Sequence, residues 1–148
     1  MKKIVIGEKL PNIKYGFRET CFGICEKNGK MLIVKKDNQY SLIGGGIEEN
    51  ESKQDCLKRE FLEEAGLEIK SVKELVTIDC FWLAGGKWPL ESVANIFIVE
   101  VEKEHFAPLE EGHILQKIDT ENVLNLLPLP YHKKALEYYF EQQKNQIG

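Results

Sequence analysis

Long apolar runs are missing from this chain of 148 residues. No stretch approaches the roughly 20 consecutive apolar residues that a membrane-spanning helix needs. Two lysines near the start, Lys2 and Lys3, are followed by a short apolar run that ends at Gly7, and this run is too short for the apolar part of a secretory leader. We therefore expect a protein with no membrane association and a cytoplasmic location.

Patterned cysteines and an excess of positive charge are missing too. The four cysteines, Cys21, Cys25, Cys56 and Cys80, include no C-x-x-C pair and have no pair of histidines nearby in zinc-ligand spacing. We expect reduced core residues, because a free cysteine usually behaves as a small buried hydrophobe. The net charge of −4 argues against stable nucleic-acid binding. Substrates that carry phosphate are still possible if a metal ion supplies the positive charge.

The chain has the length and the 43% hydrophobic content of one soluble domain, which we expect to span residues 1–148. Apolar runs on both sides of Asn28-Gly29, a strong type I′ turn signal, predict a β-hairpin. The pattern is mixed α+β. The other expected elements are a strand at 40–43, a helix at 52–65, a long hairpin of 72–83 and 92–101 with Trp88 and Pro89 in its loop, a strand at 114–118, a short helix opening at Thr120 or Glu121, and a helix at 131–143.

The helix expected at 52–65 carries an unusual stripe of acids. Ser52 and Asp55 resemble the start of a capping box, and an apolar face follows with helical period. Glu60, Glu63 and Glu64 share another face, where neighbouring like charges repel. Two of them also lie in the last turn, where the helix dipole disfavours negative charge. A divalent cation would reverse both penalties, whereas without one these acids are an ordinary solvated face.

A run of three glycines, Gly44 to Gly46, precedes that helix. We expect a loop here, because backbone without side chains can approach a metal ion or a phosphate closely. A plain turn is the alternative interpretation, and the glycines alone decide nothing. Together with the helix they form a spaced pattern: Gly45, then Glu51, then the run from Arg59 to Leu67.

This pattern resembles the complete Nudix box. The resemblance implies an α+β Nudix fold, in which an α/β/α sandwich encloses a mixed β-sheet. It implies that Glu60, Glu63 and Glu64 hold Mg²⁺ or Mn²⁺, with Arg59 orienting the acids. Gly44 and Gly45 are the expected substrate-binding positions, and the backbone carbonyl of Gly44 is an additional metal ligand in some similar proteins. Glu51 is expected to fix the loop rather than to bind the metal.

The function implied by the resemblance is metal-dependent hydrolysis of a diphosphate bond, in a nucleoside diphosphate linked to another group or in a nucleoside triphosphate. A metal ion neutralises the phosphates and activates a water, whose proton a carboxylate must accept. Glu63 is our first choice for this base, and Glu60 and Arg59 complete the expected catalytic set. Glu110 or Glu111 could act instead, although an ordinary exposed turn is as good an interpretation of that segment.

Some features leave the substrate open. Ile43 stands where the family commonly has proline, which concerns loop rigidity rather than the ligands. Aromatic residues could stack on a base, although aromatics on strands more often belong to the core; these are Phe81, Trp82, Trp88 and Phe106. We expect a small-molecule nucleotide as substrate and leave a homodimer through the faces of the 72–101 hairpin open.

Two other functions compete with hydrolysis. The first is a non-catalytic module of the same fold, which binds a nucleotide or a partner protein. Such a module has no need to keep three acids that repel one another. An isomerase acting on a prenyl diphosphate is the second. That chemistry needs a further proton donor such as a reactive cysteine, and the sequence places none beside the box.

Overall fold

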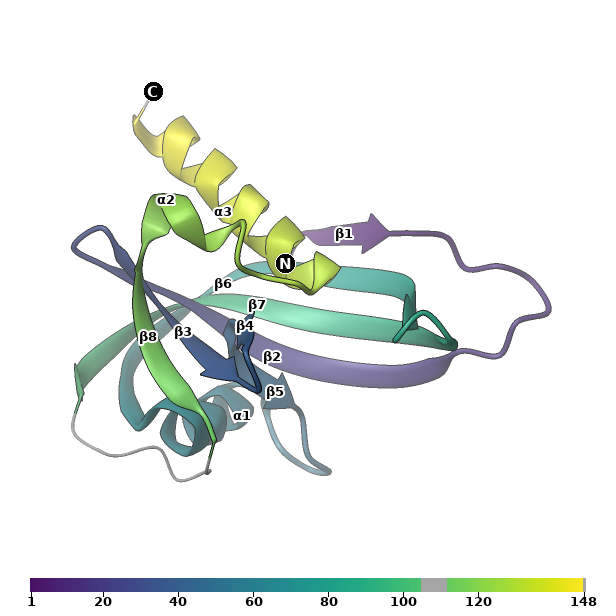
Figure 1. The fold of residues 1–148 in the computed structure, drawn as a ribbon, viewed down its shortest axis with the longest axis horizontal. Coiled ribbons are helices and arrows are strands. Elements are labelled where there is room, and N and C mark those ends of the chain that lie inside the picture. Colours follow the sequence, from purple (N-terminus) through teal and green to yellow (C-terminus); the bar gives the residue numbers. More distant parts are fainter. Residues whose placement is uncertain (105–111, 148) are drawn as a thin grey trace.

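A mixed β-sheet runs through the middle of the computed structural model, which describes residues 1–104 and 112–147 (Figure 1). Its strands follow the order β1-β6-β7-β2-β3-β4, while β5 pairs with β2 and β8 with β3. The pairs β1–β6 and β2–β7 are parallel, and the others are antiparallel, as predicted for a mixed sheet. The strands are β1 (Lys3–Ile6), β2 (Gly16–Lys27), β3 (Lys30–Lys36), β4 (Gln39–Ser41), β5 (Ile43–Gly46), β6 (Leu67–Ala84), β7 (Trp88–Glu104) and β8 (Ile114–Asp119).

Helices cover the two faces of this sheet (Figure 1). The long C-terminal helix α3 (Pro130–Ile147) lies on one face and α1 (Lys53–Glu60) on the other, and α2 (Thr120–Val123) is a short connection. Each strand sends alternate side chains to the two faces. In β3, Met31 and Ile33 pack in the core beneath α3, and Leu32 and Val34 pack in the core beneath α1. The predicted α/β/α sandwich is confirmed.

Both predicted hairpins are present. Asn28 and Gly29 have φ values of 54° and 74°, the positive values that a type I′ turn requires at both central residues. The long hairpin of β6 and β7 extends further than expected, since Ala84 already stands opposite Trp88. The prediction of a longer loop containing Trp88 and Pro89 is therefore wrong. Gly85 and Gly86 both adopt positive φ, which lets the chain reverse at once.

The glycine segment is a strand and not a loop. Gly44, Gly45 and Gly46 belong to β5, which pairs antiparallel with β2, so the loop prediction is wrong. Glycine is needed here because the paired strand lies very close: a Cβ on Gly44 would overlap the backbone carbonyl of Cys21 on that strand. The strand expected at 40–43 is divided at Leu42 into β4 and β5. Strand β1 was not predicted at all.

The acidic helix begins and ends close to the predicted positions. Ser52 caps it, with its hydroxyl accepting the backbone N–H of Asp55 at 3.1 Å. Gly66 ends it in the left-handed conformation, with φ of 65°. The prediction missed one detail: the last turn, Phe61–Ala65, is π-helix rather than α-helix. All four cysteines are free and buried, as predicted.

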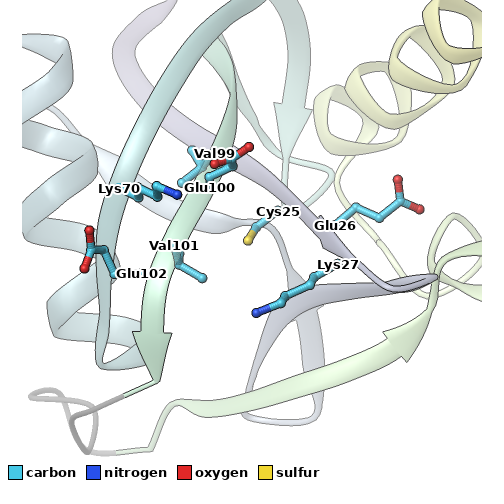
Figure 2. A pocket seen from close by; sticks show the side chains of 8 residues that line it. All are labelled: Cys25, Glu26, Lys27, Lys70, Val99, Glu100, Val101 and Glu102. Atoms are coloured by element: carbon cyan, nitrogen blue, oxygen red, sulfur yellow. The ribbon is translucent and has the colours of Figure 1, made fainter.

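The sheet splits where β2 leaves β7 after Ile24 and continues beside β3. A hollow of about 440 Å³ opens in this split (Figure 2), lined by residues of β2, β6 and β7 that include Lys27, Lys70 and Glu100. Glu26 points away from it toward α3 and accepts a hydrogen bond from Tyr139 at 2.7 Å. Charges of both signs face the hollow, which shares no lining residue with the cleft described below. Across the described residues, no helix is both long and apolar enough to cross a membrane.

Candidate active site

A polar cleft of about 340 Å³ lies between the end of the acidic helix, the glycine strand β5 and the start of α3. Strands β2, β4 and β5 supply one part of its wall, and the first turn of α3 closes another. Its lining residues are Arg18, Thr20, Phe22, Lys36, Ser41, Gly44, Gly45, Gly46, Glu60, Glu64, His113, Leu129, Tyr131 and His132. The cleft therefore combines two predicted acids with cationic and imidazole side chains from distant segments.

Arg59 connects the acids on the helix. Its guanidinium donates two hydrogen bonds to Glu51, at 2.8 and 2.9 Å, and single ones to Glu60 at 2.8 Å and Glu63 at 3.1 Å. A further bond goes to the backbone carbonyl of Gly46 at 3.0 Å. These bonds hold the pKa of Glu51 down at about 2. The same carboxylates, Glu51 first and then Glu60, raise the pKa of Arg59, which stays charged.

Glu60 packs against the glycine strand. Glu60 is only 7% exposed, and one of its carboxylate oxygens lies 2.5 Å from the point where a Cβ on Gly45 would stand. Gly45 is therefore required for space rather than for backbone flexibility. A buried carboxylate is tolerated only when it is paired, and Arg59 supplies the pair.

The mutation Gly45→Ala is expected to displace the Glu60 carboxylate and to lower any turnover at this site by an order of magnitude or more, since displacing a catalytic group by about 1 Å can cost about 100-fold. Gly46→Ala is the matched control, because its Cβ would meet Arg18 at an ordinary 3.6 Å. Steady-state kinetics and thermal denaturation of both variants test this prediction. Equal kinetics for the two would contradict it.

Glu64 is held in a different way from the other two acids. One of its oxygens accepts the backbone N–H of Gly44 at 3.2 Å, and the other lies 3.7 Å from Nε2 of His113. Glu63 instead contacts Arg59. The π-helical turn contributes to this division, because it changes the angular spacing of the side chains at the end of the helix. Glu60 and Glu64 line the cleft, whereas Glu63 is not among the lining residues.

The donor atoms of this site fit a divalent metal ion. Carboxylate oxygens with room for water and phosphate oxygens are what Mg²⁺ prefers, and Glu60 and Glu64 provide such oxygens at the cleft wall. In the described ranges, 1–104 and 112–147, no three His, Cys, Asp or Glu side chains are grouped tightly enough to hold a metal ion by themselves. Glu60 and Glu63 both face Arg59, because each accepts a hydrogen bond from its guanidinium.

Several cleft residues were not found from the sequence. Arg18 shares a face of β2 with Thr20 and Phe22, and this period of two was the signal available for it. For Lys36 and His113 no local signal exists, since only the folded chain brings them to the acids. The cations of Arg18 and Lys36 bring positive charge into the same cleft as the carboxylates.

His132, in the first turn of α3, was also missed. It is completely buried, and its Nδ1 accepts the backbone N–H of Leu42 at 3.4 Å. Burial lowers the pKa of His132 to about 3, so the ring is neutral at physiological pH. With Nδ1 as acceptor, the proton sits on Nε2. The ring also packs edge-on against Phe22, with the ring centroids 4.3 Å apart, so His132 fixes α3 to the strand break beside the glycines.

The aromatic candidates are distributed over both faces of the sheet. Phe81 packs edge-on against Tyr15 at 5.5 Å, away from the cleft. Trp82 and Trp88 lie on the face that carries α3. Phe106, like the alternative bases Glu110 and Glu111, lies outside the described residues.

Fold and site together define a three-layer domain in which an acidic helix and a glycine strand border one cleft. The family model of the NUDIX domain matches residues 17–139, and the chain therefore belongs to the Nudix family. The match includes the acidic helix, the glycine strand β5, nearly all of its partner β2, and α3 as far as Tyr139.

Known relatives agree with this assignment. A segment of 62 residues is 40% identical to the RNA pyrophosphohydrolase of Hamiltonella defensa, and it spans 40% of this chain and 37% of that protein. The MutT protein of Bacillus halodurans superposes with a TM-score of 0.69 at 22% identity, over 81% of this chain and 80% of that one. A MutT NUDIX hydrolase of Burkholderia pseudomallei gives 0.65, also at 22%, over 82% and 97%. At this sequence identity, the two structures show only that the fold is shared.

Proposed function

We propose that this protein hydrolyses a diphosphate bond in a nucleoside diphosphate linked to another group, or in a nucleoside triphosphate. The observation that supports this most directly is the cleft itself, where the carboxylates of Glu60 and Glu64 line the same space as the cations of Arg18 and Lys36. A diphosphate needs both: cations for its own oxygens, and acids for the metal ion that neutralises it.

Each side chain has a role in this proposal. Glu60, Glu63 and Glu64 would hold Mg²⁺ or Mn²⁺, which supplies Lewis acidity and lowers the pKa of a bound water. Arg18 and Lys36 bind phosphate oxygens and orient the scissile bond. Arg59 orients Glu60 and Glu63, and its hydrogen bonds to both support this role. Glu63 is the proton acceptor, with Glu60 as the alternative.

The size of the cleft and the names of the relatives support a choice of substrate class. A cleft of about 340 Å³ is near the lower end for small-molecule sites, so it accommodates the phosphates and the adjoining nucleoside rather than a large ligand. The relative from Hamiltonella defensa is named for pyrophosphate hydrolysis on RNA. Nucleotides, including the phosphorylated 5′ end of RNA, are therefore the substrates to test. The free cysteines suit the reducing cytoplasm in which such substrates occur.

A panel assay tests the proposed function. Release of phosphate or nucleotide is measured for nucleoside triphosphates, ADP-ribose, nucleotide sugars, dinucleoside polyphosphates and 5′-triphosphorylated RNA, with Mg²⁺, with Mn²⁺ and with EDTA. We expect turnover of at least one substrate that EDTA abolishes and added Mg²⁺ restores. Turnover that persists in EDTA would contradict the metal requirement. Tight nucleotide binding with no turnover would favour the non-catalytic binding module.

A further inference from the structure

Strand β1 forms an outer edge of the sheet. It pairs in parallel with β6 on one side, and within residues 1–104 and 112–147 no strand pairs with its other side. The family match begins at residue 17, so β1 lies outside the part of the chain that matches the family model. An unpaired strand edge presents a row of backbone donors and acceptors to any strand that approaches it.

The hydrogen bonds to β6 show which backbone groups of β1 are left over. The carbonyl of Lys2 accepts the backbone N–H of Thr77 at 2.8 Å. Backbone N–H and C=O groups of successive residues in a strand point to opposite sides, so the groups of Lys2 and Ile4 point to β6. Those of Lys3 and Val5 therefore point outward, away from the sheet.

The side chains of β1 leave this edge uncovered. Lysines on an edge strand commonly keep a second strand away. Here Nζ of Lys2 lies 5.2 Å from the ring centroid of Tyr138 on α3, and Nζ of Lys3 lies 3.3 Å from the carboxylate of Asp79 on β6. Both lysines thus contact their own chain. Val5 is 56% exposed, and the strand contains no proline and no bulge.

The residues around Val5 are complementary to themselves in the opposite chain direction. A two-fold axis through Val5 places this residue opposite Val5 of a second copy, in antiparallel pairing, and places Ile4 opposite Ile6. Outward-pointing backbone groups then meet outward-pointing groups, which hydrogen bonding between the two strands requires. Lys2 comes opposite Glu8, which follows soon after the end of β1. Apolar residues therefore meet apolar ones, and a cation meets an acid.

The neighbouring two-fold registers lack this complementarity. An axis through Ile4 places Lys2 opposite Ile6, and an axis through Ile6 places Ile4 opposite Glu8. Each puts a charged side chain against an isoleucine that packs on the core beneath α3. The axis through Val5 is therefore the register that the charges and the apolar side chains favour.

We propose that two copies of this chain pair through β1 in this antiparallel register, so that their sheets join into one. Ile4 and Ile6 pack at the margin of the core beneath α3, and the pairing extends this core across the axis. The strand has only four residues, so the contact is smaller than the roughly 800 Å² per partner of stable complexes. The association is therefore weak and depends on concentration. It is independent of the proposed function.

Two substitutions of Val5 test the pairing. Val5→Pro removes an outward N–H and leaves the hydrogen bonds to β6 in place, because proline is tolerated where an edge strand faces solvent. Val5→Lys places two like charges at the axis. In sedimentation equilibrium from micromolar to millimolar protein, the wild-type mass should rise toward that of two chains. Both variants should raise Kd at least about tenfold.

Leu83→Lys is the matched control. Leu83 is also 56% exposed, and it lies on the same face of the sheet as Val5, on β6 beyond the end of β1. It should associate like the wild-type protein. Thermal denaturation of each variant separates loss of pairing from loss of the fold, and if Val5→Pro does not fold, Val5→Lys still tests the contact.

A cysteine at position 5 tests the register. In Val5→Cys the axis places two thiols opposite each other, with Cα atoms about 5.5 Å apart, a separation that a disulfide can span. Oxidised glutathione should link the two chains, and each new disulfide releases two molecules of glutathione. Leu83→Cys should stay unlinked, and so should the wild-type protein, whose four cysteines are buried.

Three results would overturn the proposal. The first is a wild-type protein that keeps the mass of one chain up to millimolar concentration. The second is an equal Kd for Val5→Lys, Leu83→Lys and the wild-type protein, because the contact then lies on another surface. The third is a Val5→Cys protein that associates like the wild type but forms no disulfide, because the strands then do not meet at this axis.

Discussion

Glu64→Gln is expected to lower kcat by at least about 100-fold while the protein stays folded. Removing a residue that only orients a metal ligand lowers activity by roughly 10- to 100-fold. The loss in Glu64→Gln should be larger, because Glu64 is proposed to hold the metal itself. KM for the nucleotide should change little, since Arg18 and Lys36 still bind the phosphates. The affinity for Mn²⁺, followed by titration calorimetry, should fall together with kcat.

The fold should tolerate this change for a structural reason. The glutamine carbonyl can still accept the backbone N–H of Gly44, which Glu64 accepts at 3.2 Å. One of three clustered negative charges disappears, so the melting temperature in EDTA should stay the same or rise slightly. Glu137→Gln, an exposed acid on α3, is the matched control and should keep full activity. A folded Glu64→Gln protein with wild-type kcat would rule out metal binding by Glu64.

The sequence predicted most of the fold where local rules decide the outcome. The Asn28-Gly29 turn, the Ser52 cap and the Gly66 end of the acidic helix depend on backbone conformations that few residues favour, and all three were predicted in place. The two-faced alternation in β3 likewise shows in the order of its residues. These features depend on residues that are neighbours in the sequence, so the sequence alone is enough to predict them.

The errors concern packing between distant segments. Three consecutive glycines have the composition of a loop, but they lie in β5, where β2 approaches Gly44 and Glu60 approaches Gly45 too closely for a side chain. Strand β1 has only four residues and is specified by its parallel pairing with β6. The π-helical turn of the acidic helix carries no sequence signal that we can name.

In the candidate site, too, the residues that are close in sequence were predicted and those from distant segments were not. The helix periodicity placed Glu60, Glu63 and Glu64 together on one face, and the resemblance to the Nudix box gave them roles. The other lining residues Lys36, His113 and His132 come from three separate segments, which meet the acids only in the folded chain. Charge and composition alone could not have associated those residues with the acids.

Arg59→Met is expected to cause the largest loss of stability among changes at this site. Arg59 pairs with Glu51, Glu60 and Glu63, and its own side chain is only 21% exposed. Removing one partner of a largely buried ion pair leaves the others uncompensated, so we expect the free energy of unfolding in EDTA to fall by about 3 kcal/mol. Arg59→Lys should recover only part of this, because lysine cannot make the two-pronged contact with Glu51. Urea denaturation measures both.

Divalent metal should repair part of this loss, because Glu60 and Glu63, freed from the guanidinium, still need a cation. Mg²⁺ should therefore raise the stability of Arg59→Met by more than it raises that of the wild-type protein, whereas Lys58→Met, an exposed neighbour on the same helix, should respond like the wild type. Equal stabilisation of all three proteins would mean that the metal does not bind at these acids. Restored stability without restored turnover would then identify Arg59 as the residue that orients Glu60 and Glu63 for catalysis.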